Sequence, residues 1–296
     1  MFDRDFMDYH SDRFEDFSLL IFNNKKLVGL LPLNRKGDEV YSHQGLSYGG
    51  FVFSKKIKLK EVLSICQITL SYLKELGIVK LHYKVMPRIY HSYPADEMEY
   101  LFFLLKAQLT NTYISSVIDL QQPLKIQSNR MEGVKKAQKL GLVIKEEADF
   151  KLFWEEILIP NLNNKHNASP VHTVNEIELL ANRFPKNIKQ FNVYHKEKIV
   201  GGATIFETPH LVHMQYISGD SNKQRLGSLD FLFHYLISKH YCGKKYFDFG
   251  VSIENEGNQL NEGLVYWKES FGARSCSHQS FIIETENYSL LESVFI

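Results

Sequence analysis

The chain has 296 residues, of which 35 are Lys or Arg and 34 are Asp or Glu, so its formal net charge is +1. This length is enough for one large or two ordinary hydrophobic cores, and the balanced charge excludes a protein that an overall field draws to nucleic acid or to an acidic membrane. No apolar stretch approaches the roughly 20 residues that cross a bilayer, and the three cysteines lack the spacing of metal ligands. We therefore expect a cytoplasmic protein without a membrane span and without a bound metal.

The first part of the chain predicts alternating strands and helices. The clearest helix places four apolar residues on one face: Leu63, Cys66, Leu70 and Leu73,. Gly77 directly follows it, as expected of a helix end, and Asn23 and Asn24 indicate the turn of a hairpin. In chain order we expect a partial helix before residue 15, a hairpin (17–22 and 26–33), a strand (39–42), a helix (59–76), a strand (79–85), a helix (97–109) and a strand (113–120).

The second part predicts the same kinds of element. Thr173 and Glu176 have the spacing of a capping box at the start of a helix,. The apolar run that ends at Gly250 indicates a buried strand. In chain order we expect a strand (142–144), a helix (150–162), the helix after Val171, a hairpin (191–194 and 199–208), a strand (211–218), a helix (228–240), a strand (245–250), a short helix from Asn261 and a strand (278–284).

One order of elements therefore occurs twice: hairpin, strand, loop, helix, strand, helix, strand. This order predicts an N-terminal domain at 1–122, a basic connecting helix at 123–141 and a C-terminal domain at 142–296. The first copy begins abruptly, so we expect it to be truncated or degenerate at its start. The connecting helix carries Lys135, Lys136 and Lys139, which fit either a solvated helix face or a basic patch for a phosphorylated or nucleic-acid ligand.

The turn before the helix at 228–240 fits an anion. Residues 224–227 read Gln-Arg-Leu-Gly, and they lie where free backbone N–H groups meet the positive end of the helix dipole. Gly227 would let a ligand approach the backbone closely, and Arg225 adds charge. The alternative is an ordinary turn between a strand and a helix.

Three segments together resemble a known superfamily. The turn resembles the pyrophosphate loop of the GNAT acetyltransferases, although Leu229 stands where that family has a small residue. The segment from Asn261 to Gly272 resembles the family's last helix, and residues 246–250, Tyr-Phe-Asp-Phe-Gly, resemble a strand of its FemAB-like branch, the relatives of the peptidoglycan aminoacyltransferases. The resemblance implies an α/β (α+β) fold of two tandem GNAT-like domains, each with a mixed, mostly antiparallel sheet flanked by helices.

The resemblance also implies acyl transfer from acetyl-CoA, or another acyl-CoA, to an amine without a covalent enzyme intermediate. The implied cofactor-binding residues are the backbone of Gln215, Tyr216 and Ile217 for the pantetheine arm, and Gln224, Arg225, Leu226, Gly227 and Ser228 for the pyrophosphate. Asn261 would line the same site, and Tyr266 would protonate the leaving thiolate. The alternative for Tyr266 is a core aromatic residue on a short helix.

Several residues are candidates for the general base. Histidine suits the role because its pKa lies near working pH. His213 alternates with Gln215 on a predicted strand, so we expect both on one side. His172 is a second candidate, and Asp248, a carboxylate between two phenylalanines, requires a partner or a function,. His43 is a third histidine that fits.

The acceptor site is expected between the two domains, at the loop of the first copy. Residues His43, Gln44, Tyr48 and Gly49 offer donors, acceptors and a close backbone, and Lys268 would line the same site. They suit a hydroxyl-rich acceptor such as an amino sugar or a cell-envelope precursor in polysaccharide biosynthesis; the alternative is a loop without a ligand. Two other functions stay open: aminoacyl transfer from aminoacyl-tRNA to a peptidoglycan precursor, and a ligand-binding relative without catalysis.

Overall fold

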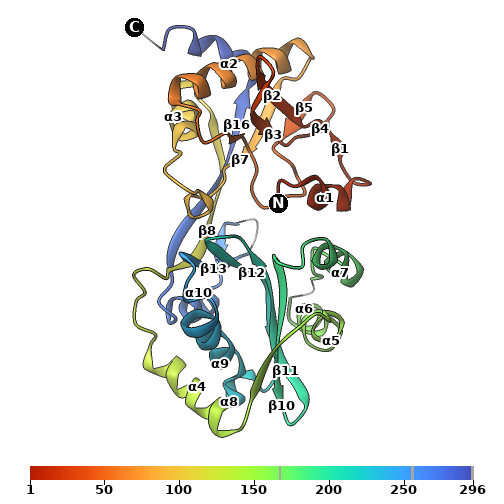
Figure 1. Cartoon of the computed structure of the whole chain (residues 1–296), viewed down its shortest axis with the longest axis vertical. Coiled ribbons are helices and arrows are strands. Elements are labelled where there is room, and N and C mark those ends of the chain that lie inside the picture. The colour runs from red at the N-terminus through yellow and green to blue at the C-terminus, as the bar shows by residue number, and fades with distance from the viewer. Residues whose placement is uncertain (167, 255–256, 295–296) are drawn as a thin grey trace. The chain divides into compact units, whose positions relative to one another are not determined.

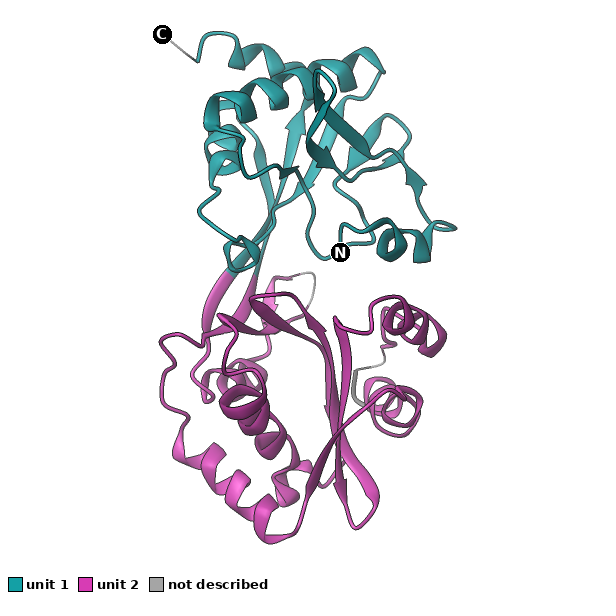
Figure 2. Ribbon diagram, viewed as in Figure 1, with its two compact units in different colours: residues 1–113, 277–296 teal, residues 114–276 magenta. Residues whose placement is uncertain are grey.

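Each part of the chain folds into a mixed sheet with helices packed on it (Figure 1). The structure is a computed structural model that describes residues 1–166, 168–254 and 257–294. It divides into unit 1, residues 1–113 and 277–296, and unit 2, residues 114–276 (Figure 2). In the part of the chain that the structure describes, no helix is both long and apolar enough to cross a membrane.

Unit 1 contains two sheets. One has the order β1-β4-β5-β7-β16, and the smaller one the order β2-β3-β6. Its elements are α1 (Arg4–Met7), η1 (Asp8–His10), β1 (Glu15–Asp16), β2 (Leu19–Asn23), β3 (Lys26–Leu31), β4 (Asn34–Lys36), β5 (Glu39–Tyr41), β6 (Val52–Phe53), α2 (Leu59–Glu75), β7 (Lys80–Lys84), η2 (Arg88–Tyr90), α3 (Glu97–Leu104), the start of β8 (Gln108–Asp119), the end of β16 (Arg274–Glu284) and η6 (Thr285–Leu291). The four apolar residues predicted on one face of α2 are all buried in the core of this unit.

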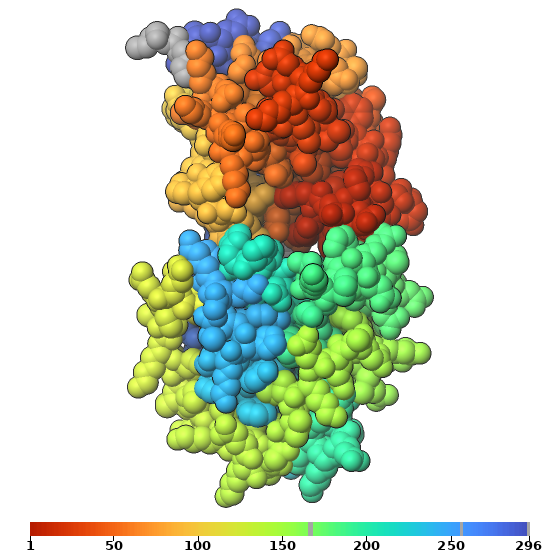
Figure 3. Space-filling model, in the orientation of Figure 1, coloured from red at the N-terminus to blue at the C-terminus, as the bar shows by residue number. Residues whose placement is uncertain are grey.

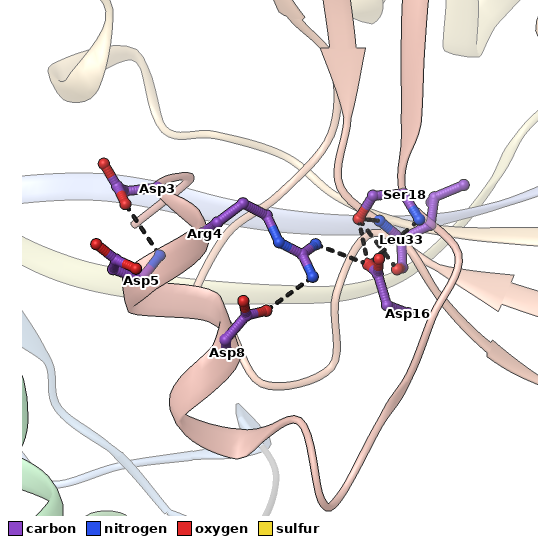
Figure 4. A network of polar contacts seen from close by, with 7 residues as sticks. All are labelled: Asp3, Arg4, Asp5, Asp8, Asp16, Ser18 and Leu33. Carbon is purple, nitrogen blue, oxygen red and sulfur yellow. Dashed lines mark hydrogen bonds and ion pairs between the residues drawn. The ribbon is translucent and has the colours of Figure 1, made fainter.

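The N-terminal segment of unit 1 is fastened by one arginine (Figure 4). The Arg4 guanidinium lies 2.7 Å from the Asp8 carboxylate and 3.1 Å from that of Asp16. Asp16 also accepts a hydrogen bond from the Ser18 hydroxyl at 2.6 Å. These bonds to Ser18 and Arg4 lower the pKa of Asp16, against the opposing effect of its partial burial. The contacts tie α1 to the beginning of β2.

Unit 2 contains a sheet of order β8-β13-β12-β11-β10-β9. Its core includes Phe191, Phe233, Phe247 and Phe271. Its elements are the end of β8, α4 (Ser128–Lys139), β9 (Val143–Glu147), α5 (Lys151–Phe153), η3 (Trp154–Leu158), α6 (Ile159–His166), α7 (Val174–Arg183), β10 (Ile188–His195), β11 (Lys198–Glu207), β12 (Leu211–Gly219), α8 (Lys223–Leu226), α9 (Ser228–Tyr235), η4 (Leu236–His240), β13 (Tyr246–Val251), β14 (Ile253–Glu254), β15 (Gln259–Leu260), α10 (Glu262–Glu269) and the start of β16.

The two units repeat one pairing pattern, which confirms the predicted fold class. In unit 1, β5 and β7 are parallel and their neighbours antiparallel; in unit 2, β12 and β13 are parallel and their neighbours antiparallel. The last strands are exchanged: β8 pairs with β13 of unit 2, and β16 pairs with β7 of unit 1. The units therefore group the chain differently from the predicted boundaries 1–122, 123–141 and 142–296, which stay a prediction about the sequence repeat.

Sequence patterns correctly predicted most helices and strands, but the helix at 97–109 was predicted too long. The helix predicted at 97–109 ends at Leu104, and β8 begins at Gln108. The physical reason is Lys106, whose positive φ of 52° is incompatible with a continuing helix,. The capping box is confirmed, because the Glu176 N–H donates to Thr173 Oγ1 at 3.2 Å and the Thr173 N–H donates to Glu176 Oε2 at 2.7 Å.

Candidate active site

The parallel pair β12–β13 ends where two of the predicted residues face each other. Its register runs from Leu211 opposite Tyr246 to His213 opposite Asp248, and it stops there. β12 continues to Gly219 along β11 on its other side. Within the described residues, 215–217 therefore have no strand partner on the β13 side. These are the residues whose backbone is expected to pair with the arm of an acyl donor.

A bulge in β12 decides which side chains share a face of the sheet. Met214 pairs with Ile205 and Tyr216 pairs with the adjacent Thr204, so Gln215 is the extra residue,. The alternation that predicted His213 and Gln215 on one side is interrupted at this point. His213 and Tyr216 instead share a face, because their partners on β11 are two residues apart,.

His213 and Asp248 form a hydrogen-bonded pair. The His213 Nδ1–H donates to Asp248 Oδ2 at 2.8 Å, and the Gly250 N–H donates to Asp248 Oδ1 at 2.8 Å. Asp248 is fully buried, whereas the side chain of His213 is 22% exposed. A proton on Nδ1 leaves Nε2 unprotonated and able to accept another proton. No three His, Cys, Asp or Glu side chains of the described residues gather as metal ligands.

Lys268 holds the end of β13 next to Asp248. It is 2% exposed, and its ammonium group donates to the carbonyls of Gly250 at 2.9 Å and Val251 at 2.8 Å. Burial lowers the pKa of Lys268 to about 8, and the Asp248 carboxylate acts in the opposite direction. Lys268 fixes the end of β13 next to Asp248, and the expectation that it lines the substrate site stays a prediction.

The lowered pKa of Lys268 predicts a pH-dependent stability. Between pH 8 and 10.5 the unfolded chain binds a proton at this residue that the native chain has lost, so native stability rises with pH in this window,. We expect the unfolding free energy of the wild type relative to Lys268→Met to rise by about 3 kcal/mol across it. Urea unfolding of both proteins at several pH values measures this, with the exposed Lys139→Met as control. Parallel pH curves for wild type and Lys268→Met would contradict the assignment.

His172 and Tyr216 form a second pair on the same face as His213. The Tyr216 hydroxyl accepts from the His172 backbone N–H at 3.2 Å and lies 2.7 Å from His172 Nδ1. Burial raises the pKa of Tyr216. The hydroxyl can therefore donate its own proton to the imidazole. The sequence indicated only the backbone of Tyr216, because nothing in it shows that a loop histidine meets this side chain.

The predicted pyrophosphate turn is packed against α4. Residues 223–226 form α8, and Gly227 follows with φ of +68°. A Cβ at Gly227 would collide with the backbone carbonyl of Gly133 in α4. Ser228 is fully buried, while Gln224 and Arg225 are exposed. Packing alone therefore explains the glycine, and the roles of Gln224, Arg225, Leu226, Gly227 and Ser228 toward a cofactor stay a prediction.

An ion pair holds α4 in this position. The Arg130 guanidinium lies 2.9 Å from the carboxylate of Asp230 in the first turn of α9. The indole N–H of Trp267 donates to the same carboxylate at 3.4 Å. A Cβ on Gly133 would collide with Asp230 as well. The sequence gives no signal for this cluster, because its members come from three distant helices.

The two polar candidates near α10 have partners of their own. The Tyr266 hydroxyl accepts from Asn129 Nδ2 at 3.1 Å, and the residue is 53% exposed. Asn261 caps α10 by accepting from the Leu264 N–H at 3.0 Å, and it donates to Glu254 Oε1 at 2.8 Å. Capping explains Asn261 without a cofactor. The acid role of Tyr266 stays a prediction.

The predicted acceptor loop of unit 1 is held by its own contacts. His43 is buried with φ of +67°, stacks on His10 at 5.0 Å between ring centroids, and has its pKa lowered to about 4 by burial. Gln44 accepts from Asn34 Nδ2 at 2.9 Å and donates its N–H to Asn34 Oδ1 at 2.7 Å.

The other two loop candidates are packed in the same way. The Tyr48 ring contacts the rings of Phe2 and Tyr90. Gly49 lies so close to the Ser42 carbonyl that a Cβ would collide with it. Internal packing therefore explains this loop's glycine and tyrosine, and the substrate role of His43, Gln44, Tyr48 and Gly49 stays a prediction.

Comparison with known proteins identifies the fold. No family model matches the sequence, and no curated protein matches it. Among solved structures, FemX matches with a TM-score of 0.67 at 9% identity over 98% of this chain and 93% of that one. L-PGS from Bacillus licheniformis matches with a TM-score of 0.61 at 11% identity, over 98% of this chain and 93% of that one. A tandem GNAT protein from the clavulanic acid biosynthesis pathway matches with a TM-score of 0.50 at 8% identity, over 96% of this chain and 88% of that one.

These likenesses show the fold alone, since all three identities are far too low to carry an activity. The chain has a GNAT-like, FemAB-related fold, which confirms the predicted resemblance. The two mixed sheets flanked by helices agree with it.

Proposed function

We propose that unit 2 is an N-acyltransferase site in which His213 is the general base. The observation that carries this proposal is the 2.8 Å hydrogen bond from His213 Nδ1 to the buried Asp248, at the point where β12 and β13 stop pairing. Asp248 fixes the ring and its tautomer, so Nε2 is the nitrogen that accepts a proton. An acyl donor would lie at the same place, beside residues 215–217.

The reaction needs one proton acceptor and one proton donor. The acceptor amine attacks the carbonyl carbon of the acyl donor, a C–N bond forms, and the amine loses a proton to His213 Nε2. The C–S bond of a thioester then breaks, and the leaving thiolate takes a proton from Tyr266. The Tyr266 hydroxyl suits this step because it accepts its hydrogen bond from Asn129, which leaves its own proton free to donate. No covalent bond to the protein is required.

We propose an acyl-CoA, with acetyl-CoA the first to test, as the donor. The exposed side chains of Gln224 and Arg225 on α8 would hold its pyrophosphate,. The proposed acceptor is the amine of an amino sugar or cell-envelope precursor in the cytoplasm. The tandem GNAT protein with this fold was solved in a form without AcCoA, which makes an acyl-CoA the first donor to test here.

A second candidate is transfer from aminoacyl-tRNA, and one observation favours it. Lys135, Lys136 and Lys139 of α4 are exposed beside α8, where Arg225 is also exposed, so this side of unit 2 is basic. α4 also covers Gly227 at the start of α9, which a CoA pyrophosphate would be expected to approach. FemX and L-PGS share the fold, and the FemAB resemblance implies tRNA as a ligand.

Two binding measurements separate these donors. The first proposal predicts micromolar binding of acetyl-CoA by calorimetry, weakened by Arg225→Gln. The second predicts tRNA binding that falls steeply with salt, and that Lys135→Gln with Lys139→Gln weakens while the exposed pair Lys186→Gln with Lys196→Gln does not,. Binding of neither ligand would contradict both donors and leave unit 2 as a ligand-binding relative without catalysis.

A further inference from the structure

The small sheet of unit 1 has an apolar face that points outward. Leu19 and Ile21 of β2 pack toward the core of the unit, so the alternate residues Leu20 and Phe22 lie on the outer face,. Phe22 pairs with Leu27 across the hairpin. The exposed fractions of these three residues are large: Leu20 62%, Phe22 55% and Leu27 47%. A solvated sheet face is normally polar, so this one indicates a partner.

Lysines lie beside these apolar side chains, toward the hairpin end of the small sheet. Lys25 and Lys26 form the end of the hairpin. β6 runs antiparallel to β3, with Phe53 opposite Gly29 and the Ser54 N–H donating to the Val28 carbonyl at 2.8 Å, so the turn after it lies toward Leu27. That turn and the residue before α2 add three further exposed lysines: Lys55, Lys56 and Lys58. Segments 19–31 and 52–60 contain no acidic residue.

The charge of this region is not neutralised within the protein. Among the described residues, none of these five lysines takes part in an ion pair. The nearest carboxylate in the sequence, Glu61, accepts a hydrogen bond from the Lys58 backbone N–H at 3.1 Å. Leu20, Phe22 and Leu27 together with these lysines form the hairpin face. Figure 3 shows parts of the first sixty residues, red to orange, at the surface of unit 1.

We propose that the hairpin face binds the surface of a membrane that contains anionic lipids. Exposed leucine and phenylalanine side chains enter the boundary between headgroups and acyl chains, and the surrounding ammonium groups meet lipid phosphates. A second copy of the chain does not fit, because two-fold pairing would bring five lysines against five lysines. Nucleic acid would leave the leucines without a role, since leucine does not stack on bases.

This surface would hold the protein at a membrane, although no helix among the described residues is long and apolar enough to span one. The net charge of +1 hides it, because acidic residues outnumber Lys and Arg in the rest of the chain. The inference does not depend on the acyl transfer proposed above. An inactive protein would bind vesicles in the same way, so the two proposals fail separately.

Vesicle sedimentation with the full chain tests the proposal. We expect binding to phosphatidylcholine vesicles that contain phosphatidylglycerol, weaker binding at higher salt, and little binding to phosphatidylcholine alone. Lys25→Gln with Lys56→Gln should lower the partition coefficient about 25-fold, since each lysine near an anionic surface contributes about fivefold. Phe22→Ser with Leu27→Ser should lower it at all salt concentrations. Phe22→Trp should shift its fluorescence to the blue when vesicles are added.

Matched variants elsewhere decide what the result means. Lys135→Gln with Lys139→Gln removes the same charge from α4, and Phe103→Ser removes an aromatic side chain that is 77% exposed on α3. Losses from these controls as large as those from the hairpin variants would overturn the proposal, as would absence of wild-type binding at low salt. A dimer that Phe22→Ser with Leu27→Ser abolishes, without vesicle binding, would assign the face to a second copy. Binding of polyglutamate that Phe22→Ser leaves unchanged would assign the hairpin face to an acidic protein.

Discussion

His213→Ala is expected to lower kcat for acyl transfer by about 10²–10⁴-fold, the usual contribution of a general base. The Michaelis constant of the acyl donor should change little, because the imidazole acts on the acceptor amine. Asp248→Asn should also lower kcat, since an amide cannot accept both the His213 Nδ1–H and the Gly250 N–H as the carboxylate does,. Steady-state kinetics over a range of pH measures both effects. Imidazole in the buffer should restore part of the activity of His213→Ala, because the side chain is partly exposed.

Two further variants make the assignment specific. His195→Ala, at the end of β10, removes a histidine of the same unit outside the pair and should leave kcat unchanged. His172→Ala tests the other histidine on this face of the sheet. Loss of activity in His172→Ala with full activity in His213→Ala would move the base to the His172–Tyr216 pair and overturn the role of His213. Unfolding curves of each variant exclude loss of fold as the cause.

The sequence predicted the elements well where the signal lies within one element. The buried face of α2 follows from a spacing of three and four residues, and the start of α7 follows from a threonine and a glutamate three residues apart. Both depend on contacts within a single helix. The end of α3 was predicted wrongly because no such pattern within the helix marks Lys106 as a residue of positive φ.

The exchange of last strands could not be predicted from the same patterns. Both copies end in a strand of suitable length, and alternation says only which face of that strand is buried. The partner of each strand depends on pairings across the whole chain, such as Phe281 with Tyr83 and Phe247 with Ile118. Non-local pairing of this kind leaves no mark on the residues themselves.

The candidate site was predicted as separate residues and not as an arrangement. His213 and Asp248 were each singled out for their own chemistry, but the bond between them requires the parallel register of β12 and β13. The bulge at Gln215 then changed which side chain of β12 accompanies His213. Polar residues inside strands gave even less signal. Gln190 and Thr204 form a buried bond at 2.7 Å, and Trp154 donates to Thr204 at 3.1 Å.

Gly227→Ala is expected to lower the free energy of unfolding by about 3 kcal/mol. A side chain at this positive φ costs about 1 kcal/mol. The Cβ must also displace the backbone of Gly133, and overpacking against a fixed neighbour costs about 1–3 kcal/mol more,. Gly141→Ala is the matched control, because Gly141 has a similar φ of +73° but no atom near its Cβ position. That variant should lose only about 1 kcal/mol.

The difference between these two variants, measured by urea unfolding, reports how firmly α4 lies against the start of α9. A large difference means that α4 is fixed there by Gly133 and by the Arg130–Asp230 ion pair. Loss of CoA binding in a Gly227 variant would then reflect a disturbed fold, and Arg225→Gln would be the sound test of the pyrophosphate site. Equal losses would contradict the packing argument. They would mean that α4 moves away at little cost, so that the N–H groups at the start of α9 become accessible to a phosphate.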